Sequence, residues 1–79
     1  MAEYAVKSEV AGVVWRVAAK PGDRIAEGDE VIILESMKME LPVLAGANGV
    51  LSAIHVKEGD SVAEGQVVAT LSLTGLAVR

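Results

Sequence analysis

The sequence contains no cysteine and no phenylalanine, and its 79 residues include one tryptophan, one tyrosine and two prolines. The absence of cysteine excludes disulfide bonds, thiolate metal sites and cysteine redox chemistry. Because large rings are so scarce, a core must be built from Val, Ile, Leu and Ala, which favours a thin, tightly layered core. The longest apolar run covers residues 31–34, whereas a membrane span needs roughly 20 residues. No charged and apolar leader opens the chain, so we expect a soluble cytoplasmic protein.

Positive charge is scarce as well. Seven basic residues stand against eleven acidic ones, and the formal net charge is −4. The basic residues are scattered singly and form no patch, which argues against a nucleic-acid partner.

A chain of this length has little room for a deep catalytic cleft. Because no linker-like segment interrupts the chain, we expect residues 1–79 to form a single domain that is monomeric in isolation. The initiating Met1 favours a free-standing protein, and a domain cut from a longer chain is the alternative.

An internal repeat organises the chain, with an offset of 37 residues that pairs residues 12–35 with residues 49–72. The identical positions of the first copy are Gly12, Val13, Lys20, Gly22, Asp23, Ala26, Glu27, Gly28, Val31 and Leu34. Several other pairs are conservative, such as Val17 with Ile54. The repeat predicts two halves that share one fold.

Each half has the pattern of two short strands separated by a Gly-Asp turn and an Ala-Glu-Gly turn, because glycine supplies positive φ and aspartate caps turns. No stretch has a helical period. We predict strands over residues 13–17, 31–35, 50–56 and 67–72, and shorter ones over 4–7, 40–44 and near Ile25 and Val62. Two all-β halves of this size predict a pair of small antiparallel sheets, stacked with approximate two-fold symmetry as a flattened barrel or sandwich.

The repeat also predicts where the chain ends lie. Shifting Lys38 by 37 residues in either direction reaches Met1 or Gly75. The hairpin that bears Lys38 should therefore lie at one pole of the molecule and both termini at the other. This arrangement would leave Lys38 accessible to partners.

The segment between the two halves carries the candidate chemistry. It consists of Glu35, Ser36, Met37, Lys38, Met39 and Glu40. The pattern predicts a hairpin turn between two strands. On composition alone, an exposed lysine is a solubilising charge and methionines fill gaps in a core.

This segment resembles the attachment hairpin of the biotinyl/lipoyl-domain family, whose biotin members carry Met-Lys-Met with the lysine modified on its ε-amine. The resemblance extends to the Ala11-Gly12 strand opening, the Lys20-Pro21-Gly22-Asp23 turn, the Glu27-Gly28 turn and their second-half copies. It is strongest to short biotin/lipoyl attachment proteins and to the carrier domains of biotin-dependent carboxylases. It implies a flattened barrel of two four-stranded sheets, with the modified lysine at the tip of a tight turn.

The resemblance implies that a biotin protein ligase attaches biotin covalently to Lys38. The loaded carrier would then shuttle carboxyl groups between biotin carboxylase and carboxyltransferase sites, while catalysis belongs to those partners. The chain itself is therefore expected to be a carrier and not an enzyme. The acyl substrate is left open, because acceptor specificity resides in the transferase.

The neighbours of Lys38 are expected to have lesser roles. In the family, the positions of Met37 and Met39 help the ligase to recognise the lysine, and flexible apolar side chains suit a surface that meets several partners. Glu35 and Glu40 either pin the turn as solvated charges or take part in ligase docking. Ser36 departs from the alanine that is common in carboxylase carriers.

Three other functions are weighed against the biotin carrier. A lipoyl carrier, or a protein that accepts both cofactors, is the main alternative. Lipoyl domains resemble one another in carrying Asp-Lys-Ala at the hairpin tip, and Met37 and Met39 do not match that pattern. An unmodified interaction domain would be favoured by loss of Lys38, which is present. An autonomous enzyme is disfavoured, since no nucleophile and base pair is evident. His55 lacks companions for a metal site, and Trp15 is expected to be a half-exposed strand aromatic and not a cofactor platform.

Overall fold

The computed structural model describes residues 2–73, which form eight strands and contain no helix that could cross a membrane. The strands are β1 (Glu3–Lys7), β2 (Gly12–Val17), β3 (Arg24–Ile25), β4 (Glu30–Ser36), β5 (Met39–Leu44), β6 (Gly49–Ile54), β7 (Ser61–Val62) and β8 (Val67–Ser72). Every predicted strand is present. The largest difference is at β6, which ends at Ile54 instead of the predicted Val56.

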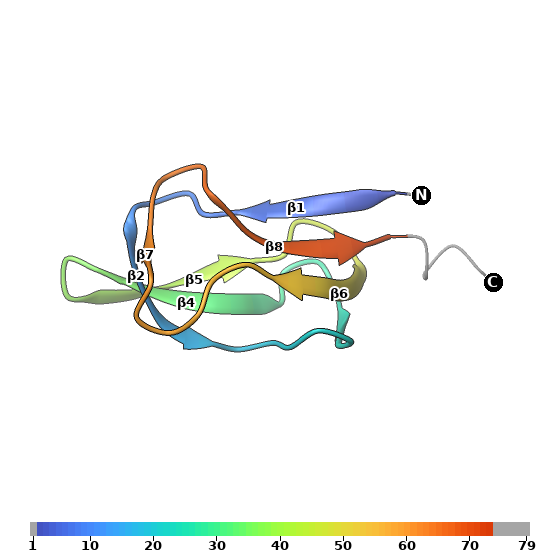
Figure 1. Cartoon of the computed structure of the whole chain (residues 1–79), viewed down its shortest axis with the longest axis horizontal. Helices are drawn as coiled ribbons and strands as arrows, with labels where there is room; N and C mark the ends of the chain where they lie inside the picture. The colour runs from blue at the N-terminus through green and yellow to red at the C-terminus, as the bar shows by residue number, and fades with distance from the viewer. Residues whose placement is uncertain (1, 74–79) are drawn as a thin grey trace.

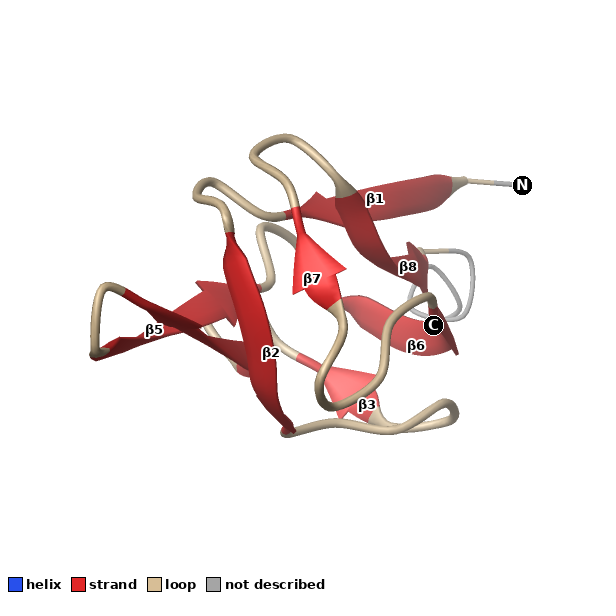
Figure 2. Ribbon diagram, turned by 60° about the vertical axis from the view of Figure 1, so that its left-hand side comes forward, coloured by secondary structure: helices blue, strands red, loops and turns tan. Residues whose placement is uncertain are grey.

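The strands form two four-stranded antiparallel sheets, which confirms the predicted fold class (Figures 1 and 2). The strand orders are β1-β8-β6-β3 in one sheet and β5-β4-β2-β7 in the other. Exchanging β1 with β5, β2 with β6, β3 with β7 and β4 with β8 converts one order into the other. The 37-residue repeat is thus a two-fold pseudosymmetry, and each sheet takes two strands from each half of the chain. We call the sheet that contains β4 and β5 the hairpin sheet, and the other the opposite sheet.

The core between the sheets consists of small aliphatic side chains, as the composition predicts. The largest side chains that are completely buried are Ile32, Leu34, Leu51 and Leu71. Leu34 and Leu71 occupy equivalent positions in the two halves, and each lies in the central part of its sheet. Burial of these apolar chains is the main source of stability for a domain that lacks disulfides.

The Gly-Asp turns close in the same way in both halves. The Oδ2 atom of Asp23 accepts a hydrogen bond from the Lys20 N–H at 3.0 Å. In the second half, Oδ2 of Asp60 accepts one from the Lys57 N–H at 3.0 Å. Aspartate therefore caps each turn, as the sequence predicts.

These turns also join the two halves to each other. Gly22 has a φ of 97° and donates its N–H to the Leu51 carbonyl at 2.7 Å. Its repeat partner Gly59 has a φ of 92° and donates to the Val14 carbonyl at 2.8 Å. Residues with a Cβ rarely adopt these angles. Each half therefore uses its turn to bind a strand of the other half, and the halves fold as one interlocked unit.

The β4–β5 hairpin projects at one end of the long axis of the molecule (Figure 1). At the other end, β1 begins and β8 ends, and Glu3 lies opposite Ser72. Beyond that pair, the Leu73 N–H donates to the Ala2 carbonyl at 3.0 Å. The predicted separation of the Lys38 hairpin from the strands that lead to both termini is confirmed. The termini themselves, Met1 and residues 74–79, lie outside the described residues.

Candidate functional site

A two-residue loop, Met37 and Lys38, joins β4 to β5. Ser36 lies opposite Met39 at the ends of the two strands. The φ angles of Met37 and Lys38 are 52° and 66°. A two-residue loop with positive φ at both positions is a type I′ turn, whose twist matches that of the flanking strands. The predicted hairpin is thus as short as antiparallel strands allow.

This turn is built from residues that fit it poorly. A type I′ turn prefers Asn-Gly, whereas this one contains Met37 and Lys38. The left-handed conformation costs a residue with a Cβ roughly 1–2 kcal/mol. Such local cost persists where the surrounding structure over-determines it, and it clusters at functional sites. The hairpin tip therefore stands out as a site on conformational grounds alone.

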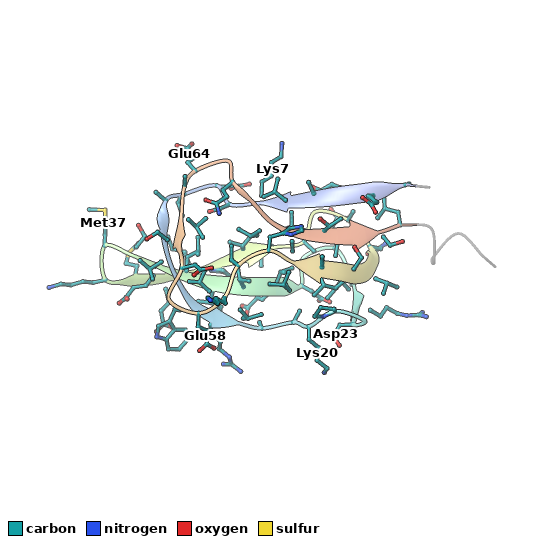
Figure 3. All side chains as sticks on the ribbon, viewed as in Figure 1. Lys7, Lys20, Asp23, Met37, Glu58 and Glu64 are labelled. Carbon is teal, nitrogen blue, oxygen red and sulfur yellow. The ribbon has the colours of Figure 1, made fainter. Side chains whose placement is uncertain are left out.

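The side chains of the tip point away from the body of the protein. Met37 is 91% exposed and Met39 is 56% exposed. Figure 3 shows Met37 standing off the end of the hairpin, far from Lys7 and Lys20. The Lys38 side chain is exposed as well and makes no hydrogen bond or ion pair with any described residue. The ion pair within residues 2–73 joins Lys20 to Asp23 at 3.6 Å, away from the tip. A partner can therefore enclose the Lys38 amine without first breaking a bond.

Glycine at position 12 lets β2 lie close to the base of the hairpin. A Cβ added to Gly12 would lie 2.7 Å from the carbonyl oxygen of Glu35, closer than real Cβ atoms come. Gly49, its repeat partner, has the same relation to the Ser72 carbonyl, at 2.8 Å. From the sequence, Gly12 is recognisable as a repeat match and not as a support of the site. Recurrence of a glycine inside a predicted strand is the signal that could have indicated this close approach.

The two predicted carboxylates of the site come together. Glu35 and Glu40 lie directly opposite each other on β4 and β5, and both are exposed. Neither has an ion-pair partner among residues 2–73. Like charges in directly opposed positions of a hairpin are destabilising. Half-buried Ser36 lies between this pair and the turn and faces Met39.

The remaining candidates lie away from the tip. Trp15 is 47% exposed, in agreement with the half-exposed strand aromatic that the sequence predicts. It is the extra residue of a β-bulge, because Val14 and Arg16 face consecutive residues of β4. His55 places Nε2 2.8 Å from Oγ1 of Thr70. Within residues 2–73, no three His, Asp or Glu side chains are placed to hold a metal ion.

The structure is thus a small two-fold β-barrel with an exposed lysine at the tip of its hairpin. The family model for biotin and lipoyl domains, described as "Biotin-requiring enzyme", matches residues 3–71. The chain therefore belongs to the biotin/lipoyl domain family, as the resemblance of its hairpin predicts.

Curated relatives are small proteins as well as large ones. The chain is 43% identical over 67 residues to a homologue of biotinylated protein TB7.3 from Mycobacterium leprae, and the match covers 85% of this chain and 94% of the relative. It is 51% identical over 45 residues to the biotin/lipoyl attachment protein of Bacillus subtilis, covering 57% of this chain and 62% of that relative. The second match thus spans less than two thirds of the relative's length.

Solved structures show the same fold. Urea carboxylase from Kluyveromyces lactis contains a segment that matches 91% of this chain with a TM-score of 0.87 and 38% identity. That segment is 6% of the carboxylase chain. The lipoyl domain of the 2-oxoglutarate dehydrogenase complex from Azotobacter vinelandii matches with a TM-score of 0.64 and 32% identity, and the match covers 80% of both chains. The similarity therefore includes both branches of the family.

Proposed function

We propose that residues 1–79 act as one non-catalytic biotin carrier domain, in which biotin protein ligase joins biotin to Lys38. The observation that carries this proposal is the turn geometry. An unpaired lysine occupies a left-handed position at the tip of a two-residue loop, between two exposed methionines. The membership of the family and the biotinylated relative support biotin as the cofactor.

The chemistry requires a primary amine that can be acylated, and Lys38 fits that requirement. The ε-nitrogen of Lys38, after losing a proton, attacks the carbonyl carbon of the biotinoyl-adenylate that the ligase makes from ATP and biotin. A C–N amide bond forms, the acyl C–O bond to phosphate breaks, AMP leaves with the electron pair, and the nitrogen releases a second proton to solvent. The step removes one positive charge, so the formal net charge changes from −4 to −5.

When bound, biotin would supply a ureido nitrogen that accepts a carboxyl group at a biotin carboxylase site and releases it at a carboxyltransferase site. The contribution of the chain is mechanical. The paired strands β4 and β5 fix the position of the tether, and Lys38 provides a long flexible arm. Tethering keeps the effective concentration at both partner sites high, provided that the arm spans them. We place this exchange in the cytoplasm and expect the carrier to be a monomer.

Met37 and Met39 are proposed as the surface by which the ligase recognises its target. Both thioether chains are mainly exposed, so neither fills the core. Flexible, polarisable side chains can repack against several partners in turn. Glu35, Ser36 and Glu40 form the base of the hairpin next to this surface.

A lipoyl carrier is the second candidate. It is favoured by the name of the Bacillus subtilis relative, a biotin/lipoyl attachment protein, and by the similarity to a lipoyl domain. The lower TM-score and identity of that lipoyl domain, compared with the urea carboxylase segment, favour biotin.

Intact mass spectrometry distinguishes these candidates. The chain is incubated with ATP, biotin and biotin protein ligase, and in parallel with ATP, lipoate and lipoate ligase. We expect a single biotinoyl addition that is lost in Lys38→Arg. Addition of lipoate alone would replace the proposal by the second candidate, and a folded chain that accepts neither cofactor would refute both.

A further inference from the structure

The internal repeat allows the outer faces of the two sheets to be compared position by position. Residues on the outer face of the hairpin sheet are Trp15, Arg16, Ile33, Pro42 and Leu44. Their equivalents in the opposite sheet are Ser52, Ala53, Thr70, Ala5 and Lys7. At these five positions the face next to Lys38 is apolar except for Arg16, whereas its symmetry equivalent carries small or polar side chains. The neighbouring pair, Val13 and Val50, is identical in the two faces.

The backbones of the two faces correspond closely. Ile33 lies opposite Arg16 on one side and Pro42 on the other. In the opposite sheet, Thr70 lies between Ala53 and Ala5 in the same way. The β-bulge recurs too, since both β2 and β6 shift register at the equivalent step. Side chains at these positions can therefore be compared without correction for backbone differences.

The comparison shows that the fold does not need an apolar outer face. The opposite sheet is built with serine, threonine, alanine and lysine at these positions, and its hydroxyls are used within the sheet. Ser52 Oγ donates to the Thr70 carbonyl at 3.0 Å. On the hairpin sheet, Trp15 is 47% exposed and Leu44 is 49% exposed. An apolar patch that the core does not require indicates an interaction surface.

This patch is continuous with the hairpin. Val13 lies opposite Glu35, which lies opposite Glu40, so these three residues form one row across the sheet. The row separates Trp15 and Ile33 from the tip that carries Lys38. A protein that encloses the Lys38 amine and extends along the sheet covers the row and the patch together.

We propose that the outer face of the hairpin sheet, centred on Trp15 and Ile33, is the surface on which biotin protein ligase docks. This inference rests on the proposed function. Charge supports this occupant, because the Glu35–Glu40 pair has no cationic partner in the described part of the chain. An enzyme that holds an adenylate phosphate presents cationic groups around its active site, and these complement the two carboxylates.

The surface also explains how one lysine can be chosen among four. Lys20 and Lys57 occupy equivalent turns, and Lys7 lies on the edge strand of the opposite sheet. Figure 3 shows Lys7 and Lys20 on the sides of the molecule, away from the hairpin tip. Lys7 lines a surface pocket with Pro42 and Leu44, but Lys38 is the lysine that lies at the hairpin tip beside the row of Val13, Glu35 and Glu40. A ligase that must bind the patch and the hairpin tip together therefore modifies Lys38 and no other lysine.

Steady-state biotinylation of the unmodified chain tests the docking surface, with Trp15→Ser as the first variant. The substitution installs the residue that the equivalent position 52 carries. Loss of a central aromatic anchor should lower kcat/KM for the ligase about tenfold or more. The loss should arise in KM, because Lys38 and its turn are unchanged. Ser52→Ala on the opposite sheet is the matched control and should behave as wild type.

Glu40→Gln and Glu3→Gln test the role of the carboxylates as a matched pair. Glu3 is the repeat equivalent of Glu40 and lies on β1 of the opposite sheet. We expect Glu40→Gln to lower kcat/KM severalfold at low salt, with the difference shrinking as salt is raised. Glu3→Gln should have no effect. Thermal unfolding of all four variants checks that each remains folded.

The outcomes separate this inference from the proposed function. If Trp15→Ser and Glu40→Gln are biotinylated as fast as wild type while Lys38→Arg is not modified, the docking surface is refuted and the carrier function stands. If Trp15→Ser keeps normal ligase kinetics but changes the oligomeric state in size-exclusion chromatography, the patch belongs to a second copy and the inference is overturned. If the wild-type chain accepts no biotin, the proposed function itself fails.

Discussion

Replacing Lys38 by glycine should stabilise the protein while removing the proposed attachment site. Lys38 has a φ of 66° at the second position of a type I′ turn. Relief of the left-handed conformation is worth roughly 1–2 kcal/mol, and the greater backbone freedom of unfolded glycine offsets roughly 0.5–1 kcal/mol of it. A net gain of about 1 kcal/mol is expected. For a domain of this size, that gain corresponds to an increase in melting temperature of about 4–8 °C.

Thermal unfolding followed by circular dichroism measures this effect, and Lys38→Ala is the control. Alanine removes the same charge and the same long side chain but keeps a Cβ, so it retains the cost of the left-handed conformation. Lys38→Ala should therefore melt close to the wild-type temperature. If Lys38→Gly proves no more stable than Lys38→Ala, the turn is not strained and the conformational argument for the site is wrong.

Three further changes test the fold around the site. Gly12→Ala should lower the free energy of unfolding by about 2 kcal/mol or more, because its Cβ would lie 2.7 Å from the Glu35 carbonyl oxygen; an unchanged thermal midpoint would contradict this contact. Leu34→Ala and Leu71→Ala, at equivalent fully buried positions, should each cost about 2–5 kcal/mol in urea unfolding, and a difference much above 1 kcal/mol would contradict a symmetric core. Pro42→Thr would give the edge strand β5 an additional exposed N–H and should increase self-association in sedimentation velocity; a wild-type profile at high concentration would show that Pro42 does not protect this edge.

The sequence predicts the fold in unusual detail because the repeat constrains it twice. Short strands such as Arg24–Ile25 and Ser61–Val62 are too brief to be recognised singly, but each supports the other at equivalent positions. The structural repeat nevertheless reaches further than the matched segments. Ser8 and Ala45 share no side-chain chemistry, yet each extends the strand pairing of its own sheet by one hydrogen bond, from the Ser8 N–H to the Gln66 carbonyl and from the Ala45 N–H to the Asp29 carbonyl, both at 2.9 Å. Backbone hydrogen bonds of this kind leave no trace in residue identity.

The candidate site is predicted in position but not in conformation. The predicted strands 31–35 and 40–44 leave residues 36–39 for the turn, and the structure limits it to Met37 and Lys38. Positive φ at both residues could not be inferred, because glycine and asparagine, the usual signals, are absent from the turn. The apolar outer face around Trp15 also escapes a single-segment reading, since a half-exposed tryptophan on a strand is unremarkable until its repeat partner Ser52 is placed beside it.

Peptide mapping of the ligase-treated chain tests the central claim most directly. The wild-type chain is incubated with ATP, biotin and biotin protein ligase, digested, and analysed by tandem mass spectrometry for modification of each of its lysines, Lys7, Lys20, Lys38 and Lys57. We expect biotin on Lys38 and on no other lysine. Biotin on Lys7, Lys20 or Lys57 at a comparable level, or an unmodified Lys38 in a folded sample, would contradict it.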